Sequence, residues 1–178
     1  MVKPLAPGDN PPARTVIQAY FLTITNLNPD SDIDLDVDFI SVTPGIDPLD
    51  GNVITFFDFL DANSPAALSN TADPIRKRRT INIPARDTGL FLLQPNVFDP
   101  EVLADANLEI RGHVEISVNN FSPLNATQEL LVTPEHRGTF IPANFNMPMV
   151  PIRDLDFDQL AYALPVVGGS ALVEVNKA

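Results

Sequence analysis

The sequence contains no cysteine and no tryptophan, only two histidines, and 8 glycines in 178 residues. Without cysteine the chain has no disulfide, no thiolate nucleophile and no cysteine-ligated zinc site. It also has no glycine-rich phosphate-binding loop, so a nucleotide site is not expected. No hydrophobic run approaches the roughly 18 residues that a membrane-spanning helix needs. We therefore expect neither a membrane partner nor a cofactor.

Basic residues are also scarce. The chain has 11 Lys and Arg residues against 23 Asp and Glu residues, which gives a formal net charge of −12. A surface of this sign repels nucleic acid and anionic lipid, and it favours solubility or cationic partners. Nucleic acid is therefore not an expected partner of the whole surface.

Proline is abundant, with 18 residues, and the hydrophobic stretches are rich in Val, Ile, Leu and Phe. Short β-prone runs separated by proline turns are typical of sandwiches and barrels. No helical segment is long enough to cover a parallel sheet, which disfavours an α/β fold. We predict an all-β fold, a single antiparallel β-sandwich (jelly-roll or immunoglobulin-like) of about eight strands with one or two short helical turns.

The hydrophobic pattern and the turn residues divide the chain into elements. Strands are expected at residues 15–25, 32–43, 53–60, 80–83, 90–94, 108–118, 130–133, 139–141 and 171–175, and helical turns at 64–68 and 99–104. Residues 157–164 fit either a helix or a strand. We favour a strand, because it would form a hairpin with the last strand across Gly168 and Gly169. In residues 108–118, Gly112 lies on the core side and indicates a bulge or a close backbone contact.

The N-terminal residues 1–13 contain Pro4, Pro7, Pro11 and Pro12 and no apolar run. Such a segment is typical of an extended arm and not of a secretory signal. We predict an arm at 1–13, suited to reach a neighbouring subunit, and a β-sandwich domain at 14–178. The expected location is the cytoplasm or an assembled particle.

Residues 32–39 alternate strictly between aspartate and apolar side chains, as in a strand with one buried face and one wet face. Ile33, Leu35, Val37 and Phe39 are expected in the core, and Asp32, Asp34, Asp36 and Asp38 on the surface. Three interpretations remain open for these aspartates: a bare solubility face, pairing with cations on a neighbouring strand or subunit, or a calcium site.

The calcium interpretation uses Asp30, Asp32 and Asp34, which have the spacing of the first ligands of an EF-hand loop. The sixth position of that loop is Leu35 instead of glycine, and no suitable glutamate follows. Calcium is therefore the candidate metal, on an incomplete motif.

A compact basic run, Arg76, Lys77, Arg78 and Arg79, holds four of the chain's 11 basic residues. It is interpreted as a polyanion site, as a solvated loop, or as a patch that docks on the acidic face (Asp34, Asp36, Asp38) of another copy. No aromatic residue is interleaved with it for base stacking, which argues against single-stranded nucleic acid.

One short motif could support catalysis. His136 lies between Glu135 and Arg137, where a histidine could act as a general base. The chain has no Gly-x-Ser-x-Gly nucleophile motif and no paired-histidine metal spacing. We therefore expect no enzyme, with His136 as a turn residue and His113 as an exposed strand residue.

Together these observations favour a non-enzymatic structural or assembly protein. It would form homo-oligomers through the N-terminal arm and through the complementary acidic and basic segments. The alternative is a β-sandwich module that binds calcium or carbohydrate, although the scarcity of aromatic residues weakens the carbohydrate version.

Overall fold

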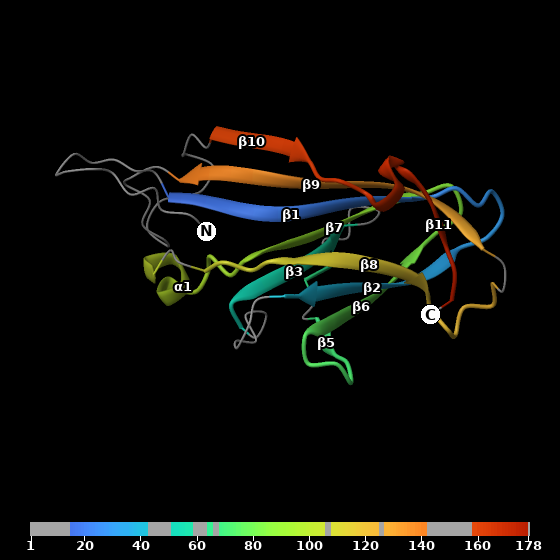
Figure 1. The fold of residues 1–178 in the computed structure, drawn as a ribbon, viewed down its shortest axis with the longest axis horizontal. Coiled ribbons are helices and arrows are strands. Elements are labelled where there is room, and N and C mark those ends of the chain that lie inside the picture. The colour runs from blue at the N-terminus through green and yellow to red at the C-terminus, as the bar shows by residue number, and fades with distance from the viewer. Residues whose placement is uncertain are drawn as a thin grey trace.

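Two antiparallel sheets form the protein, as the sequence predicts (Figure 1). The computed structural model describes residues 15–42, 51–58, 64–65, 68–105, 108–124, 127–141 and 158–177. The seven-stranded sheet has the order β10-β9-β1-β7-β3-β4, with β11 also paired to β9, and the four-stranded sheet has the order β5-β6-β2-β8. The predicted β-sandwich is confirmed. The arm at 1–13 lies outside the described residues and stays a prediction.

The elements follow the sequence order. The strands of the seven-stranded sheet are β1 (Thr15–Asn26), β3 (Val53–Asp58), β4 (Ser64–Pro65), β7 (Thr88–Pro95), β9 (Gln128–Ile141), β10 (Asp158–Ala163) and β11 (Leu172–Val175). The four-stranded sheet contains β2 (Ile33–Ser41), β5 (Ser69–Asn70), β6 (Arg76–Ile83) and β8 (Gly112–Val118). The remaining elements are the helix α1 (Pro100–Asp105) and the 3-10 turn η2 (Val167–Gly169).

The core lies between the two sheets, and β2 supplies one row of it. Ile33, Leu35, Val37 and Phe39 are all buried, as their alternation predicts. They pack in one cluster with side chains from both sheets: Leu22, Ile24, Phe57, Ile81, Ile83, Phe91, Leu93, Val118, Leu130, Val132 and Val175. Burial of each large apolar side chain contributes roughly 1.5–3 kcal/mol, so this cluster dominates the stability of the sandwich.

Two local predictions are confirmed. The side chain of Asp99 accepts a hydrogen bond from the Glu101 backbone at 2.8 Å, at the beginning of α1. Gly112 lies against the backbone of β2, where a Cβ atom would meet the carbonyl oxygen of Ile40. That close approach is what the glycine on the core side of residues 108–118 indicated.

Three local predictions are wrong. Ser64 and Pro65 form the short strand β4 beside β3 and not the start of a helical turn. The expected hairpin between β10 and β11 does not form, because both strands pair with β9, one after the other along the same edge. Residues 134–138, expected as a turn, lie within the continuous strand β9.

Pro134 is tolerated inside β9 because of its position along the strand. Its carbonyl accepts a hydrogen bond from the Leu164 backbone, so its backbone groups point away from β1. The missing N–H therefore falls on the outer edge of β9, between the stretches paired with β10 and β11. Proline in a strand is accommodated where no ladder hydrogen bond is lost.

Candidate functional site

The aspartates of β2 lie on the outer face of the four-stranded sheet, between β6 and β8. In the register of these strands, Asp36 is opposite Thr80, and Asp38 is opposite both Arg78 and Glu115. Residues directly opposite each other in an antiparallel pair project on the same face and interact. We call this group the polar ladder: Asp34, Asp36, Asp38, Arg76, Arg78, Thr80, Asn82, His113 and Glu115.

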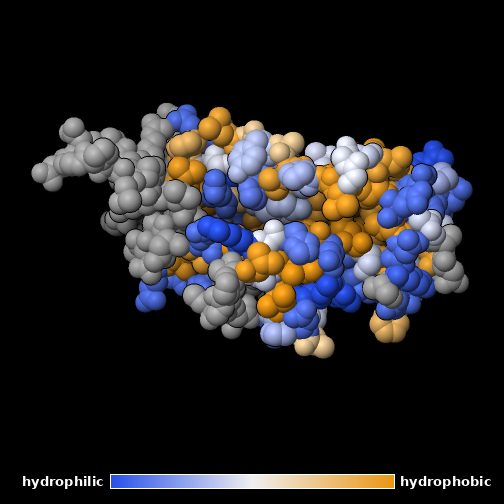
Figure 2. All heavy atoms as spheres, in the orientation of Figure 1, coloured by the Kyte–Doolittle hydropathy of each residue, from blue (hydrophilic) through white to orange (hydrophobic). Residues whose placement is uncertain are grey.

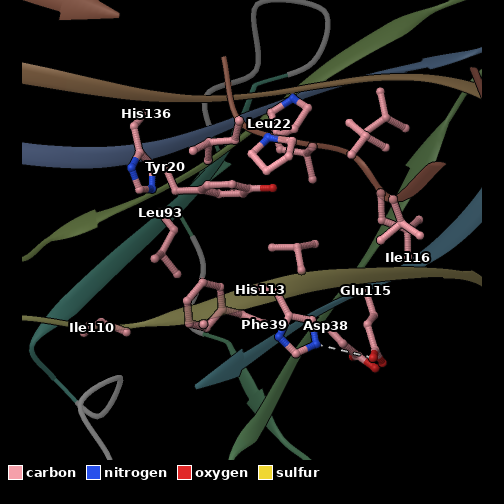
Figure 3. A pocket seen from close by; sticks show the side chains of 18 of the residues that line it. Tyr20, Leu22, Asp38, Phe39, Leu93, Ile110, His113, Glu115, Ile116 and His136 are labelled. Carbon is pink, nitrogen blue, oxygen red and sulfur yellow. Dashed lines mark ion pairs between the residues drawn. The ribbon is translucent and has the colours of Figure 1, made fainter. Parts of the chain in front are cut away.

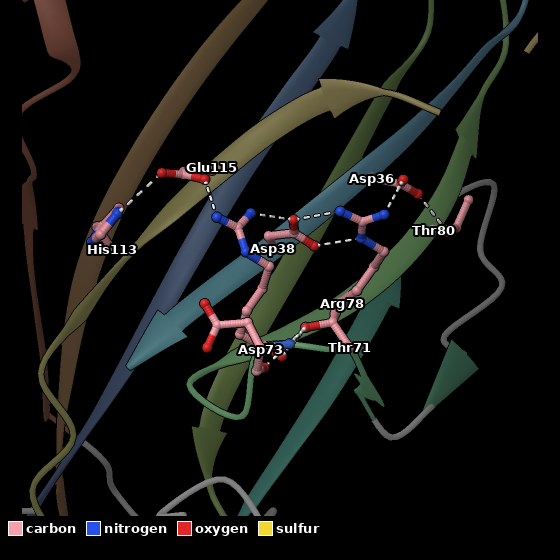
Figure 4. Close-up of polar contacts among 9 residues, drawn as sticks. Asp36, Asp38, Thr71, Asp73, Arg78, Thr80, His113 and Glu115 are labelled. Atoms are coloured by element: carbon pink, nitrogen blue, oxygen red, sulfur yellow. Dashed lines mark hydrogen bonds and ion pairs between the residues drawn. The ribbon is translucent and has the colours of Figure 1, made fainter. Parts of the chain in front are cut away.

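Asp38 is the centre of the polar ladder (Figure 4). Arg78 contacts it in a bidentate way, with Nε 2.7 Å from Oδ1 and Nη2 2.7 Å from Oδ2. Arg76 Nη1 lies 2.6 Å from Asp38 Oδ2, and its Nη2 lies 2.8 Å from Glu115 Oε2. Paired guanidinium–carboxylate contacts of this kind are among the strongest hydrogen bonds in proteins.

Asp36 is enclosed in the same way. It accepts hydrogen bonds from Thr80 Oγ1 at 2.7 Å and from Asn119 Nδ2 at 2.8 Å, and Arg78 Nη1 lies 2.8 Å away. Asp36 and Asp38 are each only 2% exposed. The prediction that these two residues face solvent is therefore wrong, because the arginine side chains of β6 lie over them. Of the three interpretations, pairing with cations on a neighbouring strand is the one observed.

Burial alone would raise the pKa of Asp38, but the hydrogen bonds from Arg78 and Arg76 outweigh it, and the pKa lies below its ordinary value of 3.8. The hydrogen bond to Asp38 in turn raises the pKa of Arg78 and of Arg76. All three groups therefore stay charged in the folded protein.

Acid should weaken the fold through Asp38. A carboxyl whose pKa is lower in the folded state than in the unfolded state stabilises the fold. This stabilisation is fully present at pH values above the unfolded-state pKa of 3.8, and it is lost as the pH falls through the folded-state pKa. We expect the free energy of unfolding to fall more steeply below pH 3.8 in the unaltered protein than in Asp38→Asn, which lacks the titrating group. Denaturant titrations across this range check it, and equal slopes would contradict the assignment.

The basic run is part of a strand and not a loop, and it does not form one patch. Arg76 and Arg78 project outward into the polar ladder, whereas Lys77 and Arg79 are opposite the core residues Phe39 and Val37. Lys77 is 8% exposed and donates a hydrogen bond to Asn70 Oδ1 at 2.6 Å. Burial lowers the pKa of Arg79. Strand alternation thus splits the four predicted interaction residues between two faces.

Two of the three candidate calcium ligands, Asp32 and Asp34, have separate protein partners. Asp32 Oδ1 accepts a hydrogen bond from the Ala85 backbone at 3.1 Å, and Asp34 Oδ1 accepts one from Asn82 Nδ2 at 2.8 Å. Asp30 lies in the preceding turn. Among the described residues, no group of three or more His, Asp or Glu side chains is arranged to hold a metal ion.

Glu135, His136 and Arg137 are not brought together either. Glu135 and Arg137 share one face of β9 and form an ion pair at 3.0 Å, with Arg137 placed 4.2 Å from the centre of the Phe21 ring. His136 projects to the opposite face, where its Nδ1 lies 2.9 Å from the hydroxyl of Tyr162 and its ring is edge-on to Tyr20. Burial lowers the pKa of His136, which favours the neutral imidazole. The structure therefore contradicts the expectation of His136 as a turn residue.

A cleft between the two sheets is the feature that sequence reasoning missed. It has a volume of about 1630 Å³ and opens between β8 on one side and β1 and β9 on the other. Figure 3 shows Tyr20 and His136 on one wall and Phe39 on the other, with His113 and Glu115 at the outer side of β8. Hydrophobic residues lie between the two layers on the face turned toward the viewer in Figure 2. Among the described residues, the sandwich is therefore incompletely closed along this side.

The backbone of β8 forms the lower rim of this cleft. β8 is the last strand of its sheet and pairs with β2 on one edge. Hydrogen bonds from Val42 to Arg111 and from Asn119 to Asp34 show that the odd-numbered residues bond to β2. Gly112, Val114 and Ile116 therefore direct their N–H and C=O groups outward. In the described part of the chain, that outer edge is bonded only at Val118, by Asn176.

Searches against protein families, curated proteins and solved structures gave no match for this chain. Within the described ranges, no helix has the length and apolar character needed to cross a membrane. The polar ladder, the cleft and the edge of β8 are therefore the features from which we infer the function.

Proposed function

We propose that this protein is a non-enzymatic structural protein that assembles into homo-oligomers through the open side of its sandwich. The observation that supports the proposal best is the outer edge of β8, where the outward backbone groups of Gly112, Val114 and Ile116 have no partner strand among the described residues. Unpaired strand edges are templates for pairing with another chain. The apolar cleft directly beside this edge favours the same role.

Exposed hydrophobic side chains near the cleft add support. Leu160 and Tyr162 on β10 are 63% and 49% exposed, and Leu172 on β11 and Val167 are exposed as well. Val167 and Leu172 also line the cleft. Contiguous exposed apolar surface is typical of an interaction site. The N-terminal arm at 1–13 keeps its proposed role as an additional contact with a neighbouring subunit.

The acidic and basic segments, which the sequence suggested as contacts between copies, are not assembly surfaces in this proposal. Asp36, Asp38, Arg76 and Arg78 already neutralise one another within a single chain. Docking of one copy's acidic face on another copy's basic run would have to break these contacts. We therefore assign the polar ladder to holding the four-stranded sheet together, and assembly to the open side.

The test is the native mass of the untagged protein by size-exclusion chromatography with light scattering, at low and high salt. We expect a species larger than the 19.4 kDa chain that persists in high salt, because apolar and backbone contacts are little screened. A species that dissociates in high salt would favour docking through the charged segments instead. A monomer at both salts would contradict assembly altogether.

The cleft also supports a second candidate, a ligand-binding module. A largely apolar pocket with a few polar groups is typical of a small-molecule site, and Tyr20 and His136 supply polar groups here. This lining favours an apolar ligand over carbohydrate. A rise of the melting temperature with a long-chain fatty acid, and none with calcium against chelator, would support this version.

A further inference from the structure

We propose that two copies of the chain pair their β8 strands antiparallel about a two-fold axis at Val114, so that their four-stranded sheets become one continuous sheet. This inference rests on the proposed assembly function and names the surface and the partner, a second copy of the same chain. It also specifies the register, which the unpaired backbone groups and the side chains of β8 determine.

The backbone supplies the first argument. Gly112, Val114 and Ile116 direct both their N–H and C=O groups to the outer edge, and Val118 is occupied by the Asn176 carbonyl at 2.9 Å. A register centred on Val114 pairs Gly112 with Ile116 of the second copy and Val114 with itself. It uses the free part of the edge and ends before the segment that the C-terminus already covers.

Charge complementarity supplies the second argument. In the same register, His113 of one copy is directly opposite Glu115 of the other, and the two-fold axis repeats the pair. Both side chains are on the outer face and about half exposed, at 57% and 50%, and within one chain His113 Nε2 already lies 3.5 Å from Glu115 Oε1. Pairing therefore does not have to break this contact; it brings the pairs of the two copies side by side across the two-fold axis. An imidazole N–H can donate to a carboxylate, and unlike partners directly opposite each other stabilise a strand pair.

The neighbouring symmetric registers are less favourable. A register centred on Glu115 places two glutamates directly opposite each other. It also requires the outward backbone groups of Val118 to pair with the second copy, although the N–H of Val118 already donates to Asn176. A register centred on His113 places that residue opposite itself and needs the backbone of Ile110, which lies outside β8. Like charges directly opposite each other destabilise a sheet, and strand geometry at Ile110 would have to form on binding.

The side chains on the inner face agree with the register centred on Val114. Val114 and Ile116 are only partly buried and line the cleft. Pairing would place Val114 against Val114 of the second copy, which removes apolar surface from water. Gly112 would be opposite Ile116, where the absence of a side chain leaves room for the larger residue.

The absence of cysteine from the chain makes cross-linking a direct test, because any introduced cysteine is the only one. Residues in a hydrogen-bonded antiparallel pair have Cα atoms about 5.5 Å apart, within the roughly 4.4–6.8 Å range of disulfides. We expect Val114→Cys to give a covalent dimer under mild oxidation. The matched variant Ser117→Cys, three residues along the same strand, should remain monomeric on a non-reducing gel.

A mixing experiment tests the register a second time. His113→Cys and Glu115→Cys should cross-link when the two variants are mixed, and much less when either is alone. Rapid cross-linking of either variant with itself would overturn the register. If light scattering shows an oligomer but Val114→Cys does not cross-link, the proposed β8 pairing is overturned and the proposed assembly function stays in place. If light scattering shows a monomer, both are overturned.

Discussion

Replacing Asp38 by alanine is expected to lower the free energy of unfolding by about 2–4 kcal/mol. Removing one partner of a buried ion pair typically costs about 3–5 kcal/mol, because the remaining charge loses its partner. Here the guanidinium groups of Arg76 and Arg78 are about 30% exposed and can regain some hydration, which reduces the cost. Denaturant unfolding of Asp38→Ala beside the unaltered protein measures the effect.

Asp34→Ala is the matched control for this prediction. Asp34 is on the same face of β2 but contacts only the amide of Asn82, in an exposed position. Loss of a single exposed hydrogen bond of this kind should cost about 0.5 kcal/mol. Equal effects of the two substitutions would mean that the contacts of Arg76 and Arg78 with Asp38 do not stabilise the folded chain.

Replacing Val114 by proline is expected to dissociate the homo-oligomer while the chain stays folded. The N–H of Val114 points to the outer edge of β8, so proline there loses no hydrogen bond to β2. It does remove a donor at the centre of the proposed pairing and places a ring against the second copy. Native mass measured by light scattering should fall to that of one chain.

Glu115→Pro is the comparison, because the backbone of Glu115 bonds to Asp38 within the sheet. This variant should lose folded structure by circular dichroism, whereas Val114→Pro should keep the spectrum of the unaltered protein. A folded Val114→Pro protein that remains fully oligomeric would show that the copies associate through another surface.

The sequence correctly predicts which side chains of β2 are buried in the core, but it wrongly predicts that Asp36 and Asp38 on the opposite face are exposed. Alternation determines which side chains point inward, and Ile33 to Phe39 follow it. The same pattern does not determine what lies over the other face. Arg76 is 38 residues away from Asp38 along the chain, and only the pairing of β6 with β2 brings them together.

The basic run is a second case in which the sequence pattern alone misleads about what lies on one surface. Four consecutive cations look like one patch in the sequence, but strand alternation directs Arg76 and Arg78 outward and Lys77 and Arg79 toward the core. The run continues directly into residues 80–83, for which the sequence predicts a strand, and both belong to β6. Extending that strand backward by its alternation would have predicted the split.

The cleft and the free edge of β8 could not be predicted from local patterns. They depend on the strand order, which leaves β8 at the end of its sheet, and on the divided pairing of β10 and β11 along β9. The partial burial of Tyr20, Val114 and Ile116 is the structural sign of the open side. The hydrophobicity of such side chains indicates only that they tend to face inward.

Hydrogen–deuterium exchange of the backbone amides in dilute and concentrated protein tests the central claim most directly. If copies associate through the open edge, the amides of Val114 and Ile116 should exchange freely when dilute and become protected on concentration, while β2 stays protected throughout. Exchange at these two amides that does not change with concentration, in a sample whose mass does increase, would contradict assembly through β8.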